Sequence, residues 1–436
     1  MSVRSGKQSD LCEKETLPGD RYIPVIKWTV YALAALYFIN CFTPLRIHYD
    51  MLRYFSIKDC IEIGCPPTAD PNDYLPFGYT ALLLGLSKLG ILRSFSIVFI
   101  NGLYLLGGLY FVRKVFSYLH SAPFFLVLVL LNWTVIKFFT HPLSELQYLF
   151  FSMASVYAFY TYTQNKKIIQ LLMAFGFAGL AFLTRTVGIA LVAALCLGLI
   201  WEYRKQLSSL IRKNKILVAV ILLCMAGILL FSKQLGLNHY TGVMSRQFKG
   251  GVYFSEMLGW HFREWGEISL NISVAKVIGL LPAAPVIGLL IAFGILMVAG
   301  FLFICFIKKN RTPFIVKAYL FCYMFLMFNW PFSDPRFWVP VIPLIAAVIA
   351  QTAFNGNKWL KMPLIFLFIV YATFGILSVG YMTYTSLNKK VFAKTQAAGV
   401  YRNEYETHFF GRPLSDTATR IDPFVMSVLE RYGGKK

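Results

Sequence analysis

The chain has 436 residues, of which 57% are hydrophobic and 14% are charged, whereas soluble globular proteins carry about 25% charged residues. This composition excludes one or two soluble domains and indicates a polytopic membrane protein. Lys and Arg outnumber Asp and Glu by 42 to 20. In a membrane protein, such an excess anchors cytoplasmic loops and attracts anionic lipid. No basic run lies outside the apolar pattern, so we expect no nucleic-acid partner.

The apolar segments predict about eleven membrane-spanning helices, because a span needs about 20 apolar residues and at least about 17. Residues 1–20 are polar and no A-x-A-like cleavage site follows the first apolar segment, so we expect that segment to remain as a span. The predicted spans are residues 24–43, 95–112, 122–140, 146–163, 168–184, 186–202, 215–234, 283–307, 314–330, 338–354 and 361–384. The expected fold class is therefore an all-α polytopic membrane protein.

Lys and Arg in the short connections predict the orientation of these spans. The side that holds most of them, together with the tail 1–23, is expected to be cytoplasmic. The alternation holds only if 168–202 forms two spans joined at Thr184-Arg185-Thr186. The outer side then receives the loops 44–94, 141–145, 235–282 and 331–337 of a catalytic membrane domain spanning 24–384, and the C-terminal tail 385–436. Residues 78–92 are apolar but too short to span, which favours a juxtamembrane helix in the first outer loop.

The first outer loop carries a carboxylate, an imidazole and a guanidinium close together, at Asp50, His48 and Arg46. Transfer of a sugar from a lipid phosphate requires a positioned base for the acceptor hydroxyl. It also requires cationic or hydrogen-bonding groups for the phosphate that leaves. We interpret Asp50 as this base and His48 and Arg46 as substrate-binding residues. A solvated loop acid is the alternative for Asp50.

A second acid, Glu145, ends the short outer turn that begins at His141. Carboxylates at the rim of a bilayer are costly and indicate function. Glu145 could orient the acceptor, or it could be an acid favoured by a helix N-terminus. His141 could contact substrate or be an ordinary interfacial histidine. Asp50 and Glu145 could share a divalent cation, but their spacing requires none, and no metal site is predicted.

Several arginines are candidates for contact with a phosphate or a headgroup. Arg185 lies between two apolar stretches, where it could contact the donor phosphate or cap a tight hairpin. Arg336 follows Asp334 amid aromatic residues, and its planar fork suits a phosphate at headgroup depth. The same aromatic residues also fit a membrane-interface belt. Arg246 and Arg263 lie near tryptophans in the loop 235–282, which suits sugar stacking and headgroup contact, or a plain lid.

Two cysteines of the first outer loop, Cys60 and Cys65, are spaced for a local disulfide. Two free thiols are the alternative. A zinc site is poorly supported, because no paired Cys or His spacing accompanies them.

With these residues, the chain resembles the GT-C superfamily of polyprenyl-phosphate-sugar glycosyltransferases, especially its protein-mannosyltransferase and aminoarabinose-transferase branch. The matching features are the early acid Asp50, the stretch Leu75-Pro76-Phe77-Gly78-Tyr79 before a juxtamembrane helix, the turn acid Glu145, and Asp334-Pro335-Arg336-Phe337-Trp338 followed by two spaced prolines. Two features depart from the family pattern: Met51-Leu52-Arg53 follows the first acid, and Phe337 replaces the usual Tyr.

The resemblance implies an inverting glycosyl transfer at the outer face of a membrane, expected to be the inner membrane of a bacterium. Asp50 would take the acceptor proton, and Arg336 and Arg185 would hold the phosphate of a polyprenyl-linked donor. Tyr79 and Asp334 would belong to the substrate site. The expected partners are the lipid-linked sugar donor, membrane lipid, and an acceptor that is a glycan, a lipid or a protein.

Two other functions remain open on the sequence. A polysaccharide polymerase or ligase would depend on arginines in the large outer loop rather than on Asp50. A lipid or glycan transporter or flippase would be expected to show paired halves with broken helices, and no internal repeat is visible.

Overall fold

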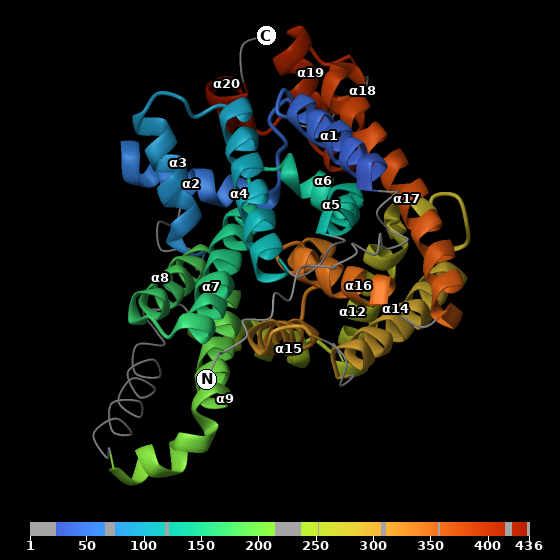
Figure 1. The fold of residues 1–436 in the computed structure, drawn as a ribbon. Helices are drawn as coiled ribbons and strands as arrows, with labels where there is room; N and C mark the ends of the chain where they lie inside the picture. The colour runs from blue at the N-terminus through green and yellow to red at the C-terminus, as the bar shows by residue number, and fades with distance from the viewer. Residues whose placement is uncertain are drawn as a thin grey trace, which may run out of the picture.

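The computed structural model describes residues 23–65, 75–117, 122–213, 237–251, 253–306, 311–355, 358–414 and 421–433. Within these ranges all regular structure is helical (Figure 1). The α-helices are α1 (Ile23–Asn40), α2 (Tyr49–Ile63), α3 (Phe77–Lys88), α4 (Ser94–Val115), α5 (Ala122–Leu131), α6 (Trp133–Phe139), α7 (Glu145–Asn165), α8 (Ile168–Thr184), α9 (Ile189–Lys213), α11 (Leu237–Lys249), α12 (Phe254–Leu270), α13 (Val274–Val277), α14 (Ala283–Phe306), α15 (Phe314–Phe328), α16 (Ile342–Asn355), α17 (Lys358–Leu387), α18 (Lys389–Thr395), α19 (Arg402–Phe410) and α20 (Pro423–Tyr432). Three short 3₁₀ helices are η2 (Thr186–Gly188), η3 (Pro335–Trp338) and η4 (Gln396–Gly399).

Four helical segments of the described residues are long and apolar enough to cross a membrane: Ser94–Val115, Thr186–Arg204, Ala283–Phe306 and Ile365–Leu387. Three shorter apolar helices accompany them: Ile168–Thr184, Phe314–Phe328 and Ile342–Gln351. The chain is therefore an all-helical protein with membrane-span candidates, while the count of about eleven spans stays a prediction. The expected span 215–234 lies outside the described residues.

The apolar segment 122–140 differs from its prediction as one span, because it forms the two helices α5 and α6. The helices separate at Asn132, whose side chain accepts hydrogen bonds from the backbone N–H groups of Thr134 and Val135 and so caps α6. An Asn side chain competes with the helix for its own backbone donors in this way. The segment 168–202, by contrast, forms two helices as predicted, with Arg185 in an extended conformation between α8 and η2.

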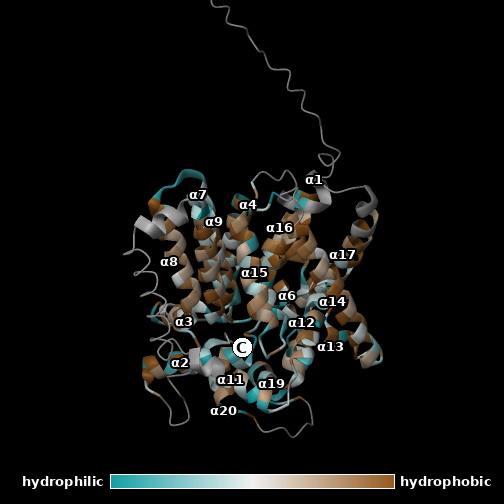
Figure 2. Cartoon of the chain, turned by 90° about the horizontal axis from the view of Figure 1, so that it is seen from below, coloured by the Kyte–Doolittle hydropathy of each residue, from teal (hydrophilic) through white to brown (hydrophobic). Residues whose placement is uncertain are grey.

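The apolar helices form one bundle, and the more polar helices gather at one end of it (Figure 2). Within the bundle, α7 packs against both α4 and α8, α9 packs against α15, and α12 packs along α14. At the polar end lie α2, α11, α19 and α20 (Figure 2). Helices that the sequence assigns to the first outer loop, the loop 235–282 and the C-terminal tail thus share one end of the molecule.

The C-terminal helices pack onto the first loop. Lys58 of α2, almost fully buried, donates a hydrogen bond of 2.7 Å to the hydroxyl of Tyr432 in α20. Arg431 pairs with Asp59 of α2 at 3.3 Å. Buried charges are stable only when they are paired, so these contacts fix α20 on α2.

Candidate active site

Residues from four parts of the chain meet at the polar end of the bundle. Asp50 lies in the first turn of α2, Glu145 opens α7, Arg185 follows α8, and Asp334 and Arg336 belong to the segment of η3. The sequence predicted all five as site residues, and the structure brings them together. Acids in the first turn of a helix lie next to its unpaired N–H groups, which favours their ionised form.

Arg336 is the centre of this cluster. Its Nη2 lies 2.5 Å from Asp50 Oδ2, and its Nε lies 3.0 Å from Asp334 Oδ2 and 3.8 Å from Glu145 Oε1. Its Nη1 has no hydrogen-bond partner among the described residues, although it is buried. A buried donor without a partner is costly, so Nη1 is suited to an anionic ligand.

Arg185 and Glu145 form a second ion pair beside the first. The Nη1 of Arg185 donates a hydrogen bond to Glu145 Oε1, and it lies 3.5 Å from the hydroxyl of Ser144. Glu145 has a 2% exposed side chain, and its second oxygen has no hydrogen-bond partner in the described part of the chain. Both guanidinium groups lie over the ring of Phe337, Arg185 at 5.6 Å and Arg336 at 5.0 Å from its centroid. An apolar ring at this position thus supports both cations.

The backbone around Arg185 is fixed by the close approach of α3. A Cβ atom at Gly78 would lie 2.7 Å from the carbonyl oxygen of Leu183, two residues before Arg185. Only glycine allows this contact without a shift of one helix. Gly78, in the first turn of α3, therefore has a packing role at the site.

The charged groups change one another's ionisation. Burial raises the pKa of Asp50, but the charge and hydrogen bond of Arg336, with the charges of His48 and Arg185, hold that pKa below its usual value. Burial and the charge of Arg336 lower the pKa of His48, whose ring nitrogen Nδ1 accepts a hydrogen bond from the backbone N–H of Asp50. Burial raises the pKa of Asp334 despite the neighbouring Arg336. At neutral pH, Asp50 is ionised and His48 is neutral.

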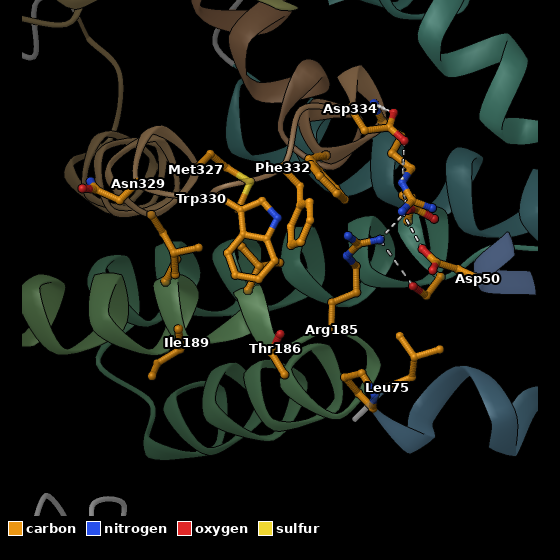
Figure 3. A pocket seen from close by; sticks show the side chains of 18 of the residues that line it. Asp50, Leu75, Arg185, Thr186, Ile189, Met327, Asn329, Trp330, Phe332 and Asp334 are labelled. Carbon is orange, nitrogen blue, oxygen red and sulfur yellow. Dashed lines mark hydrogen bonds and ion pairs between the residues drawn. The ribbon is translucent and has the colours of Figure 1, made fainter. Parts of the chain in front are cut away.

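A cavity of about 940 Å³ opens from these groups toward the apolar bundle. Asp50, Glu145, Arg185 and Arg336 line one part of it, and apolar side chains of α9 and α15 line another. Figure 3 shows Arg185 and Asp50 on one side of the cavity, with Trp330 and Phe332 beside Arg185. Phe321 and Phe325 at the apolar end are more than half exposed on the surface of α15. The cavity therefore has a charged end and an apolar end that reaches the exposed apolar surface of α15.

Arg53 also belongs to the site, and the sequence analysis did not assign it a role. Its Nη1 lies 3.7 Å from Asp50 Oδ1, and the side chain lines the cavity. The signal that could have found it is its spacing of three residues from Asp50, because residues i and i+3 share one face of a helix.

Four other predicted site residues, His48, Arg46, Tyr79 and His141, lie beside the cavity rather than in its wall. Arg46 is buried and donates hydrogen bonds to Gln396 and Ser386. Tyr79 is fully buried, with its ring centroid 5.0 Å from that of Tyr54, which does line the cavity. His141 is buried with Nδ1 2.8 Å from the carbonyl oxygen of Lys137. These contacts support neighbouring elements.

The two arginines predicted from the loop 235–282 also lie outside the cavity wall. Arg246 is exposed on α11, and among the described side chains of that helix Met244 alone lines the cavity. Arg263 of α12 lies with Nη2 2.9 Å from the hydroxyl of Ser333 and Nε 3.5 Å from Glu267.

No group of three or more His, Cys, Asp or Glu side chains among the described residues is placed to hold a metal ion. The carboxylates of Asp50, Glu145 and Asp334 instead surround Arg336. Cys60 and Cys65 form a disulfide at the end of α2, which resolves the alternative that the sequence left open.

Comparisons of the chain with protein-family models, with curated proteins and with solved structures find no match in any of the three. The chemistry of the cavity is therefore the basis on which a function can be assigned.

Proposed function

We propose that this protein is an integral membrane glycosyltransferase that moves a sugar from a polyprenyl-phosphate donor to an acceptor. The observation that carries the proposal is the cavity with two ends. One end holds three guanidinium groups and three carboxylates, and the other end is apolar and lies between α9 and α15. A lipid phosphate that carries a sugar has the matching chemistry, with a long apolar tail next to an anionic group.

The charged end supplies the groups that an inverting transfer needs. Asp50 accepts the proton of the acceptor hydroxyl or amine, whose lone pair attacks the anomeric carbon of the sugar. The bond from that carbon to the phosphate oxygen breaks, and the electron pair leaves with the polyprenyl phosphate. A single displacement of this kind inverts the anomeric centre, as in inverting glycoside chemistry.

Arg336 and Arg185 stabilise the phosphate as it gains charge. The unpartnered Nη1 of Arg336 offers the phosphate a donor while Nη2 holds Asp50. The guanidinium group of Arg336 thus fixes the positions of both the base, Asp50, and the site for the leaving phosphate. Glu145 holds Arg185 in place and offers its unpartnered oxygen to a hydroxyl of the sugar or of the acceptor.

The proposed reaction takes place on the outer face of the membrane, in a bacterium the periplasmic face of the inner membrane. This assignment is supported by the predicted orientation of the basic connections and by the disulfide of the first loop, since disulfides persist in oxidising compartments. The resemblance to the GT-C superfamily described above agrees with this chemistry.

The test measures release of polyprenyl phosphate from a panel of polyprenyl-phosphate hexoses and pentoses, with membranes of the source organism as the source of acceptor. The purified wild-type protein should release the leaving group from one donor of the panel. Asp50→Asn should lower this rate about 100- to 10,000-fold, the range for loss of a general base. Glu62→Gln, a carboxylate change on the same helix and outside the cavity wall, should leave it within a factor of two or so.

Retention of activity in a folded Asp50→Asn protein would contradict the role of the base. If Arg246→Gln lost activity while Asp50→Asn kept the wild-type rate, the results would instead favour a polymerase or ligase that uses the large outer loop.

A further inference from the structure

The segment 329–338 carries Asp334 and Arg336 into the cavity, yet it has little regular structure of its own. It joins α15 to α16 and contains only the short helix η3. A guanidinium on such a segment needs support from elsewhere if it is to hold one position. The support comes from α12, none of whose residues lines the cavity.

Three side chains of α12 hold the segment at its start, its middle and its end. His261 Nε2 lies 2.7 Å from the carbonyl oxygen of Trp330, and Arg263 Nη2 donates to the hydroxyl of Ser333 at 2.9 Å. The indole Nε1 of Trp338 donates to Glu264 Oε2 at 2.7 Å.

The groups at the two ends of the segment form one buried network. Glu264 Oε2 also lies 2.8 Å from His261 Nδ1, so both ring nitrogens of His261 face oxygen atoms, and Nε2 donates to the carbonyl oxygen of Trp330. His261 and Glu264 are 0% exposed and Trp338 is 1% exposed. Burial of polar groups is costly without partners, and the loss of one partner leaves the others unpaired. An apolar core would pack equally well without fixing the direction of the indole.

We propose that Glu264 and His261 are positioning residues that hold Arg336 in register with Asp50 through Trp338 and Trp330. The inference rests on the proposed function, because it concerns the arginine that would bind the donor phosphate. Arg336 lies two residues before Trp338 on η3, so the hydrogen bond that anchors the indole also restrains the backbone that carries the guanidinium. A displacement of about 1 Å at a reacting group costs about 100-fold in rate.

Trp338→Phe tests the proposal because it removes the ring N–H group, together with part of the indole, and keeps an aromatic ring at the buried position. The chain offers a matched control in Trp265, the next residue after Glu264, whose indole is also buried and packs edge-on against Trp338. The Nε1 of Trp265 has no hydrogen-bond partner among the described residues. Trp265→Phe therefore makes the same change in a neighbouring ring without removing a hydrogen bond.

The first measurement is the binding of polyprenyl phosphate to the purified full-length protein in nanodiscs. The second is the KM of the transfer reaction for the donor and for the acceptor. Trp338→Phe should weaken binding and raise the donor KM about 10-fold or more, with the acceptor KM unchanged, and Trp265→Phe should match the wild type. Glu264→Gln keeps the shape of the side chain and one acceptor oxygen, so it should fall between the two, and it serves as the test if Trp338→Phe fails to fold. A general loss of packing would instead lower the melting temperature of both Trp variants and leave the ratio of the KM values unchanged.

Equal behaviour of Trp338→Phe and Trp265→Phe, or wild-type binding by Glu264→Gln, would overturn the inference. Arg336→Gln separates this failure from failure of the proposed function. If Arg336→Gln loses polyprenyl phosphate while Trp338→Phe binds it normally, only the positioning role is wrong. If Arg336→Gln also binds it like the wild type, the phosphate site itself is wrong.

Discussion

Asp50 and Glu267 are carboxylates that lose most of their hydration, yet their pKa values move in opposite directions. Burial raises the pKa of both. At Asp50 the guanidinium of Arg336, 2.5 Å away, outweighs burial and lowers the pKa. At Glu267 the nearest guanidinium, on Arg263, is 3.5 Å away and the neighbouring Glu264 adds a like charge, so burial dominates and the pKa rises to about 7.

We expect the loss of the proton from Glu267 to make the protein less stable as the pH rises. A carboxyl group whose pKa is higher in the folded than in the unfolded protein contributes stability that is fully present below pH 4.5 and is lost as the pH rises through about 7. A rise from 4.5 to about 7 corresponds to about 3 kcal/mol. In detergent, the melting temperature of the wild type should therefore fall more between pH 5 and pH 8 than that of Glu267→Gln.

The control for this measurement is Glu256→Gln, which changes an exposed carboxylate on the same helix and should keep the wild-type pH dependence. Parallel curves for the wild type and Glu267→Gln would show that the buried carboxylate does not control stability in this range.

At the scale of helices, the sequence predicted the long apolar elements, whose ends carry local signals, but not the polar helices of the loops and of the C-terminal tail. Proline or charge marks the starts of α3, α7 and α15, and the break at Arg185 follows from the alternation of basic connections. The break at Asn132 was missed because a single Asn within an apolar segment does not interrupt the hydrophobic pattern. Its capping contact is visible only in three dimensions.

The candidate site was predictable where a charged residue stands at the boundary of an apolar segment, as at Asp50, Glu145, Arg185 and Arg336. A charged side chain at such a boundary is costly unless it is paired, and these four residues form ion pairs with one another. Arg263 could not be separated from them by sequence, because an arginine that supports a loop and one that contacts substrate have the same local surroundings. Pairs such as Glu264 and Trp338, 74 residues apart, follow only from packing.

The disulfide at the end of α2 gives a prediction for this element. In protein purified without reductant and then denatured, an alkylating reagent should modify Cys41, Cys196, Cys305 and Cys322 but neither Cys60 nor Cys65. After reduction both should react, as mass spectrometry of the peptides can establish. The four cysteines that are free among the described residues are the internal control, and alkylation of Cys60 and Cys65 without reduction would mean that this loop does not reach an oxidising compartment.

At the scale of the whole molecule, the polar helices belong to segments that are far apart in sequence but share one end of the bundle (Figure 2). This arrangement places the cavity, the loop 329–338 and the C-terminal helices on one side of the apolar region. The connection between α7 and α8, with the exposed Lys166, lies at the other end. A lipid-linked donor in the cavity would thus have its phosphate at one membrane surface and its tail between α9 and α15.

Labelling of single cysteines from outside intact cells tests this arrangement together with the orientation. In a background without native cysteines, Gly250→Cys, Phe332→Cys and Phe410→Cys should all react with a membrane-impermeant maleimide, because their segments lie at the polar end. Lys166→Cys should react only after the cells are opened, since basic connections stay in the cytoplasm. If Lys166→Cys alone reacted in intact cells, the cavity would lie on the cytoplasmic side. The disulfide of Cys60 and Cys65 would not persist there, and transfer at the outer face could not occur. A mixed result among the three polar-end positions would mean that they do not share one membrane face, and the apolar end of the cavity would then not lie along the bilayer.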